Sequence, residues 1–212
     1  MLKYIYTFLA ITLITSACTN NESKKSQTQD SVVTNTIPTS TEREEDLTNV
    51  ITRFVRAYIT QDNDKANKLI HPDLGFTVIY RPGVVDAFVR VDSIDFRNPI
   101  PEYYAYPEIT NDFSLMYTTL PTFDCGTEKW SKLGFYCDTT VHPLQLSNII
   151  AFDNTSNEDK ISEDELLKIE NDEQNSFRVI LTSETPLIFH VQLYKGAWYV
   201  TTLDRAYGTC EA

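Results

Sequence analysis

The sequence predicts an α+β domain in which N-terminal helices pack on one curved antiparallel sheet. Apolar residues recur at helical spacing between Leu47 and Tyr58. Residues 187–203 alternate apolar and polar side chains on both sides of a Lys-Gly turn, as two strands of a hairpin do. Helices that precede a series of strands, instead of alternating with them, are typical of this fold class.

The first helix is expected to begin near Asp46, after acidic residues that favour a helix N-terminus through the helix dipole. Its apolar face is formed by Leu47, Val50, Ile51, Phe54, Val55 and Tyr58. A second, shorter helix is expected in QDNDKANKLIHPD, with Asp62 as its cap and Pro72 as its stop.

Strands are expected to follow, separated by a turn at Arg81-Pro82-Gly83 and by a loop at residues 98–112, which contain three prolines. A short helix should open at Ser162, because Glu165 completes a capping box with it. The expected strands cover residues 76–80, 84–91, 114–120, part of 132–140, 177–183, 187–194 and 197–203.

The composition supports a folded domain with an acidic surface. Apolar residues make up 42% of the 212 residues, which is enough for a core. There are 30 acidic residues against 18 basic ones, so the net charge is −12. Such a surface is repelled by phosphate backbones, so nucleic-acid binding is excluded as a function class.

Residues 1–17 have the features of an export signal. Lys3 precedes the apolar stretch Tyr4–Ile14, which is shorter than the roughly 20 apolar residues that span a bilayer. The small residues Thr15-Ser16-Ala17 come just before Cys18. This junction resembles the bacterial lipoprotein signal, although Thr15 stands where that pattern usually has Leu. An ordinary secretory signal with an incidental cysteine is the alternative.

The resemblance implies that Cys18 becomes the new N-terminus and carries the lipid, such as palmitate. Residues 18–45 are rich in Ser, Thr, Asn and Gln, and are expected to form a flexible tether to a single domain at residues 46–212. The chain is therefore expected at the bacterial cell envelope, on the outer membrane, with the membrane itself as a partner through the lipid.

The order of elements, with the segments HPDLGF and VQLYKGAWYVTTLDR, resembles the ketosteroid-isomerase-like, or nuclear-transport-factor-like, cone fold over about residues 46–205. The chain is also similar to uncharacterised lipoproteins of Bacteroidetes-type bacteria with IHP near the start and W…LDR…C at the end. The resemblance implies a cone-like sheet with a pocket inside it, where some enzymes of the fold use Asp, His or Tyr.

His190 is the first candidate for such a pocket. It shares one side of its expected strand with Ile188, Gln192 and Tyr194, and one sheet face lines the pocket in a cone fold. Asp86 and Tyr80 are weaker candidates of the same kind. A lone polar residue on a strand is otherwise a surface group or a satisfied hydrogen-bonding partner.

His71 and Asp73 form a second candidate pair, as a base and the carboxylate that orients it. The structural alternative is that His71 ends a helix and Asp73 lies in the following turn.

Cys125 and Cys137 are expected to form a disulfide, because an exported protein meets an oxidising compartment. With Cys18 acylated, Cys210 is left over, so three pairings and three free thiols all remain open. No metal or cofactor is expected. There is no CxxC, the histidines are scattered, and DNTSNEDKISED lacks the Gly and the final Glu of a calcium loop.

Tyr103, Tyr104 and Tyr106 could contact a sugar or a partner protein, since tyrosine has a flat apolar body and a polar tip. The alternative is that they pack the proline-rich loop onto the domain.

The function expected from these features is a non-catalytic domain, tethered at the envelope, that binds a small molecule or an envelope protein. The first alternative is a ketosteroid-isomerase-like enzyme that transfers a proton in a cone pocket through His190, Asp86 or Tyr80. The second is a structural component of a surface complex that uses the tyrosine loop.

Overall fold

The structure, a computed structural model, describes residues 40–156, 160–183 and 185–207. The predicted signal at residues 1–17, Cys18 and Cys210 lie outside these residues. The described residues confirm the α+β class. Their helices and strands are α1 (Ser40–Ile59), α2 (Asn63–Asn67), β1 (Phe76–Tyr80), β2 (Ala87–Val91), β3 (Leu115–Tyr117), β4 (Phe123–Asp124), β5 (Lys129–Trp130), β6 (Gly134–Cys137), α3 (Gln145–Ser156), α4 (Glu163–Gln174), β7 (Ser176–Thr182), β8 (Leu187–Tyr194) and β9 (Ala197–Asp204).

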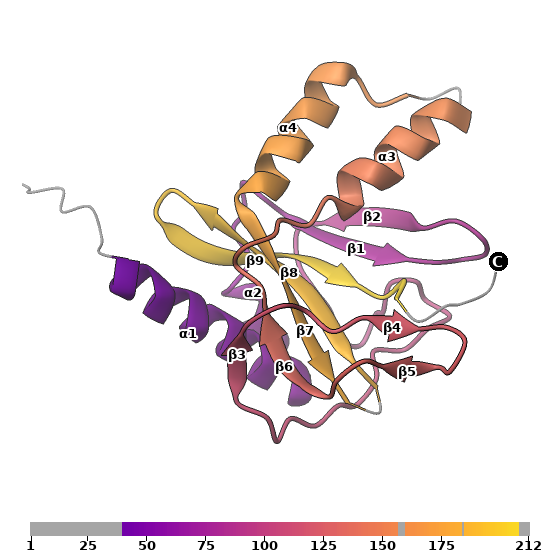
Figure 1. Ribbon diagram of the computed structural model, residues 1–212. Helices are drawn as coiled ribbons and strands as arrows, with labels where there is room; N and C mark the ends of the chain where they lie inside the picture. Colours follow the sequence, from indigo (N-terminus) through magenta and orange to yellow (C-terminus); the bar gives the residue numbers. More distant parts are fainter. Residues whose placement is uncertain (1–39, 157–159, 184, 208–212) are drawn as a thin grey trace, which may run out of the picture. The chain divides into compact units, whose positions relative to one another are not determined.

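Seven strands form one sheet in the order β2-β1-β9-β8-β7-β6-β3, and the sheet is not closed, with β2 and β3 at its edges (Figure 1). Strands β4 and β5 form a separate small hairpin. The expectation of a purely antiparallel sheet is wrong for two pairs, because β1 runs parallel to β9 and β3 parallel to β6. Parallel neighbours need long connections, and both pairs are separated by long stretches of chain.

Helix α1 begins at Ser40, earlier than the predicted start near Asp46, so residues 40–45 belong to the helix and not to a tether. The predicted apolar face is buried: the ring of Phe54 lies 4.8 Å from that of Phe189 on β8. The predicted cap of α2 is confirmed, since Asp62 accepts a hydrogen bond from the Lys65 amide at 3.0 Å.

The two faces of the sheet contact different helices. Val78 of β1 belongs to the larger apolar cluster, which includes α1 and α2. Its neighbour Ile79 belongs to a second cluster with Leu146, Ile149 and Ile150 of α3 and Ile169 of α4. Adjacent strand residues point to opposite faces, so α1 packs on one face and α3 and α4 on the other (Figure 1).

The predicted start of α4 is confirmed, because Ser162 accepts a hydrogen bond from the Glu165 amide at 3.3 Å. The predicted C-terminal strands are confirmed as β7, β8 and β9. Lys195 and Gly196 have φ angles of 50° and 85°, which fit the two-residue turn of the β8–β9 hairpin. Helix α3 was not predicted.

Candidate functional site

A cavity of about 540 Å³ lies between α4 and the face of the sheet opposite α1. Residues of β1, β2, β8, β9 and α4 supply most of its wall. Most of the lining side chains are polar: Asp73, Thr77, Arg90, Ser162, Asp164, Glu165, Lys168, Asp172, Glu173, Ser176, His190, Gln192, Tyr194, Thr201 and Thr202.

His190 lines this cavity from the middle of β8. Its neighbours Phe189 and Val191 pack in the α1 cluster, so the alternation of the strand turns His190 to the other face. The side chain is 2% exposed, and its Nε2 atom has no hydrogen-bond partner among the described residues. Burial, and then the charge of Arg178, lower the pKa of His190 well below 6.5, so the ring is neutral at neutral pH.

Buried polar side chains surround His190 on the neighbouring strands. Thr202 of β9 lies opposite His190, and Thr77 of β1 lies opposite Thr202. Gln192 donates a hydrogen bond from Nε2 to Asp172 Oδ1 of α4 at 3.2 Å. The result is a polar strip across three strands that faces the cavity.

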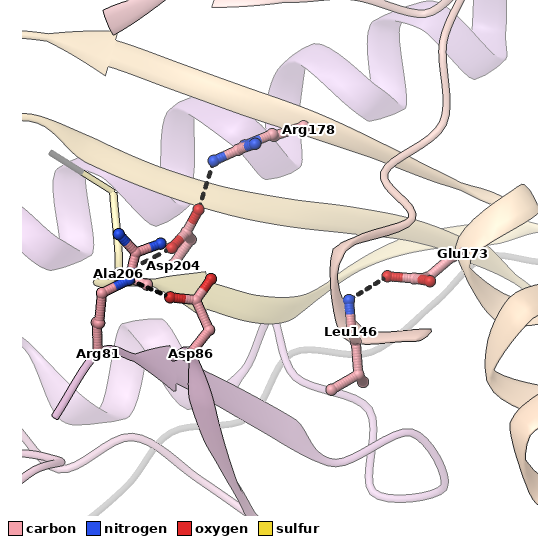
Figure 2. Close-up of polar contacts among 7 residues, drawn as sticks. All are labelled: Arg81, Asp86, Leu146, Glu173, Arg178, Asp204 and Ala206. Carbon is pink, nitrogen blue, oxygen red and sulfur yellow. Dashed lines mark hydrogen bonds and ion pairs between the residues drawn. The ribbon is translucent and has the colours of Figure 1, made fainter. Parts of the chain in front are cut away.

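A half-buried ion pair joins two strands on the same face. Arg178 of β7 donates to Oδ2 of Asp204 on β9, whose side chain is fully buried (Figure 2). The other oxygen of Asp204 accepts from the Ala206 amide at 3.0 Å. Removing one partner of such a pair leaves an uncompensated buried charge, so the pair fixes β7 and β9 around the central β8.

Glu173 connects the two helices on this face. Its carboxylate accepts a hydrogen bond from the Leu146 amide at 2.8 Å (Figure 2). It also accepts from the Ser147 amide at 3.2 Å and from the Ser147 hydroxyl. Amides in the first turn of a helix have no acceptor within the helix, and Glu173 supplies one for these two amides of α3. Burial raises the pKa of Glu173, although the hydrogen bonds oppose that rise.

The charge of the cavity wall is mainly negative. Five lining carboxylates, those of Asp73, Asp164, Glu165, Asp172 and Glu173, stand against the two cationic side chains of Arg90 and Lys168. Two of the five carboxylates are ion-paired, since Arg90 Nη1 lies 3.8 Å from Glu165 Oε1 and Lys195 Nζ lies 2.9 Å from Asp73 Oδ2, so Asp164, Asp172 and Glu173 remain against Lys168. Such a wall attracts cationic groups.

Asp86 and Tyr80 do not line this cavity. Asp86 accepts a hydrogen bond from Arg81 Nε at 2.5 Å (Figure 2). Tyr80 lines a different cleft, described below. The structure therefore does not bring the three candidate proton-transfer residues together.

His71 and Asp73 lie together in the turn before β1, with His71 Nδ1 3.9 Å from Asp73 Oδ2. His71 Nδ1 accepts a hydrogen bond from the Asp73 amide at 3.0 Å, and its ring packs edge-on against Tyr194 and Tyr199. The Asp73 carboxylate accepts from Lys195 Nζ at 2.9 Å and from the Tyr194 hydroxyl at 3.1 Å, and these bonds lower its pKa. Asp73 also lines the cavity.

The tyrosine cluster divides between core and surface. Tyr103 is 74% exposed and Tyr104 47%, but Tyr106 is 5% exposed and packs edge-on against Tyr58 and Phe96. The expectation that Tyr106 contacts a partner is therefore wrong, because this ring fills the core under the loop.

Arg205, which the sequence did not single out as a site residue, holds the proline-rich loop. It donates hydrogen bonds to the carbonyl oxygens of Ile100, Tyr104 and Ala105 at 2.5–2.7 Å. Its guanidinium lies 4.1 Å from the centre of the Tyr104 ring and 4.6 Å from that of Tyr106. The sequence shows only an arginine directly after an apolar strand. If such an arginine is buried, its guanidinium needs several hydrogen-bond acceptors.

The expected disulfide between Cys125 and Cys137 is not formed. Cys137 is a free thiol that points from β6 into the α1 cluster, and burial raises its pKa to about 12. Cys125 is disulfide-bonded, but it lies in the exposed turn between β4 and β5, away from that core. The two other cysteines, Cys18 and Cys210, lie outside the described residues.

Within the described ranges, no group of three or more His, Cys, Asp and Glu side chains is arranged to hold a metal ion. In the same ranges, no helix has both the length and the apolar character needed to cross a membrane. Comparison of the chain with protein-family models, with curated proteins and with solved structures finds no match.

Proposed function

We propose that this protein is a non-catalytic binding domain that takes a small polar ligand, such as an amine, into the cavity beneath α4. The observation that carries the proposal is His190, a buried neutral imidazole in a polar cavity, whose Nε2 atom has no hydrogen-bond partner among the described residues. Buried polar groups without partners are rare in native proteins and call for an explanation.

A ligand would explain this arrangement energetically. Leaving a buried polar atom unsatisfied costs about 1–3 kcal/mol, which a ligand that hydrogen-bonds Nε2 would recover. The cavity, at about 540 Å³, is also of a size that holds a small molecule. The excess of carboxylates on its wall favours a positively charged amine over an anion.

The proton-transfer alternative has weaker support. An efficient general base has a pKa near the working pH, whereas burial drives the pKa of His190 well below 6.5. Tyr80 and Asp86 are elsewhere, so the cavity has only its own wall residues to act with His190.

We further propose that the domain is a cone-like member of the ketosteroid-isomerase-like group. The support is that one sheet face packs on α1 while the other, with His190, lines a cavity. The proposed location is the bacterial envelope, on the outer membrane, where a lipid on Cys18 would hold the domain. Its support is the sequence of residues 1–18 alone.

The proposal is tested by thermal unfolding of the purified domain with a panel of polyamines, amino sugars and amino acids, and with neutral polyols as comparators. At least one amine should raise the melting temperature of the wild type and fail to raise that of His190→Leu. The matched control is His142→Leu, which changes an exposed histidine outside the cavity. An amine that stabilises wild type and His190→Leu equally would contradict the proposal.

A further inference from the structure

A second, larger cleft is lined by aromatic rings. Its volume is about 880 Å³, and it lies among the proline-rich loop, the β4–β5 hairpin and the residues that follow β9. Among the described residues, seven aromatic side chains line it: Tyr80, Tyr103, Tyr104, Phe113, Phe123, Trp130 and Tyr207. None of its lining residues belongs to the cavity beneath α4.

Several of these rings are held in place by one another. The ring of Trp130 stacks on that of Tyr207 at 5.6 Å and an interplanar angle of 29°. Phe123 meets Trp130 edge-on at 5.3 Å. The Arg205 guanidinium lies over the Tyr104 ring, 4.1 Å from its centre, and holds that ring in place. A ligand that stacks on these rings therefore need not immobilise flexible side chains, which lowers the cost of binding.

The charges at the cleft favour an uncharged ligand. Arg205 gives its hydrogen bonds to three loop carbonyls, and Arg81 is bonded to Asp86. The other charged residues on the wall are Glu128 and Lys129, which are adjacent and of opposite sign. The tyrosines of the wall carry hydroxyl groups, whereas the Thr182 and Ser183 hydroxyls donate to backbone carbonyls of Gly134 and Thr185.

We propose that this cleft binds a neutral oligosaccharide. A sugar ring has apolar C–H faces that stack on aromatic rings and a rim of hydroxyl groups that exchange hydrogen bonds with polar side chains. The cleft supplies stacking rings and tyrosine hydroxyls, and two of its three cations have a carboxylate beside them: Arg81 is bonded to Asp86, and Lys129 follows Glu128 in the chain. A purely apolar ligand would cover the Glu128 carboxylate without giving it a hydrogen bond, which costs free energy on binding.

The test uses neutral oligosaccharides of glucose, xylose, mannose and N-acetylglucosamine, titrated by calorimetry and by tryptophan fluorescence. The chain has two tryptophans, of which Trp198 is 8% exposed in the core. At least one oligosaccharide should bind at millimolar or lower concentration and change the Trp130 emission. Trp130→Ala should weaken that binding about tenfold or more, as the loss of a stacking platform does.

Two control variants separate this site from the rest of the molecule. Phe152→Ala removes a ring that is 52% exposed on α3, outside the cleft, and should leave the affinity unchanged. His190→Leu should also leave it unchanged, so failure of the cavity proposal and failure of this one are distinguishable. If Trp130→Ala does not fold, Tyr103→Ala, which changes a ring that is 74% exposed, should weaken binding severalfold.

Three results would overturn the proposal. The first is the absence of binding by every oligosaccharide of the panel at millimolar concentration. The second is binding that Trp130→Ala and Tyr103→Ala do not weaken. The third is Trp130-dependent binding of poly-L-proline in place of the sugars, which would make the cleft a peptide site.

Discussion

At the scale of single residues, His190 combines two properties that are costly to maintain. It is buried in the middle of the sheet, and its Nε2 atom lacks a partner among the described residues. The nearby Arg178 charge adds to burial in keeping the ring neutral. A core optimised only for stability would place an apolar side chain here, so this position is where the structure departs from pure packing.

The depressed pKa of His190 predicts a pH dependence of stability. Below about pH 6.5 the unfolded chain binds a proton at this residue and the folded chain does not, so stability falls as the pH falls. Between neutral pH and pH 5, the wild-type free energy of unfolding should fall more steeply than that of His190→Gln, by at most about 1.4 kcal/mol per pH unit. Urea unfolding at several pH values measures this, and parallel curves would refute it.

At the scale of elements, the contacts that set the two sites join segments far apart in the chain. Glu173 at the end of α4 binds the first turn of α3, and Arg205 after β9 binds the loop at residues 98–112. In each contact, one charged side chain hydrogen-bonds several backbone groups. These bonds offset the cost of burying the charge, so both residues can be buried.

Removal of the Glu173 carboxylate should destabilise the domain. Glu173→Ala leaves the amides of Leu146 and Ser147 without their acceptor, and the expected loss is about 1–3 kcal/mol in the free energy of unfolding. Denaturant unfolding measures it. The neighbouring exposed position gives the control, and Gln174→Ala should change stability by less than about 0.5 kcal/mol. Equal effects of the two substitutions would mean that the carboxylate does not anchor α3.

Removal of Arg205 should release the proline-rich loop. Arg205→Ala takes away three hydrogen bonds and the cation over Tyr104 and Tyr106, and each lost bond to a charged donor contributes about 1.5–3 kcal/mol. Limited digestion with chymotrypsin should then cut near Tyr103 sooner than in the wild type. Arg97→Ala, at an exposed position before the same loop, is the control and should be cut at the wild-type rate.

The elements that the sequence predicted best are those with local signals. The Ser162 cap, the Lys195-Gly196 turn and the alternation in β8 depend on residues close in the chain, and the structure confirms them. Helix α3 was missed because its apolar residues Leu146, Ile149 and Ile150 are followed by a polar, acidic run. The parallel pairs β1–β9 and β3–β6 depend on contacts between distant segments, which no local pattern encodes.

The candidate site was predictable only in part, for the same reason. Strand alternation correctly predicted that His190 faces away from Phe189 and Val191, on the face of the sheet that lines the cavity. The pairing of Asp86 with Arg81 and the burial of Tyr106 are properties of tertiary packing. The separation of Cys125 from Cys137 also depends on tertiary packing, so their spacing in the chain predicted the wrong disulfide.

At the scale of the whole molecule, the proposals assign different tasks to different parts. The α1 face of the sheet is the main apolar core, while the α4 face holds the polar cavity and the loop region holds the aromatic cleft. The sequence before the described residues would attach this domain to the envelope through Cys18. The domain would then meet its ligands at the membrane surface.

The proposed anchor predicts a change in cell fractionation. The full chain produced in a bacterial host should be recovered with the membranes, and mass spectrometry should find acyl chains on Cys18. Cys18→Ala should move the chain out of the membrane fraction, because one lipid anchor is lost and the surface is too acidic to bind anionic headgroups. Membrane recovery of Cys18→Ala equal to that of the wild type would contradict the anchor.

Amide NMR of the domain shows whether a ligand binds at His190 in the cavity beneath α4. The isotope-labelled domain is titrated with the amine that stabilises it most in thermal unfolding. Binding beneath α4 should change the amide chemical shifts of Thr77, Gln192 and Thr202. These changes should be absent in His190→Leu. Shifts confined to the aromatic cleft, or shifts beneath α4 that persist without His190, would contradict binding at His190.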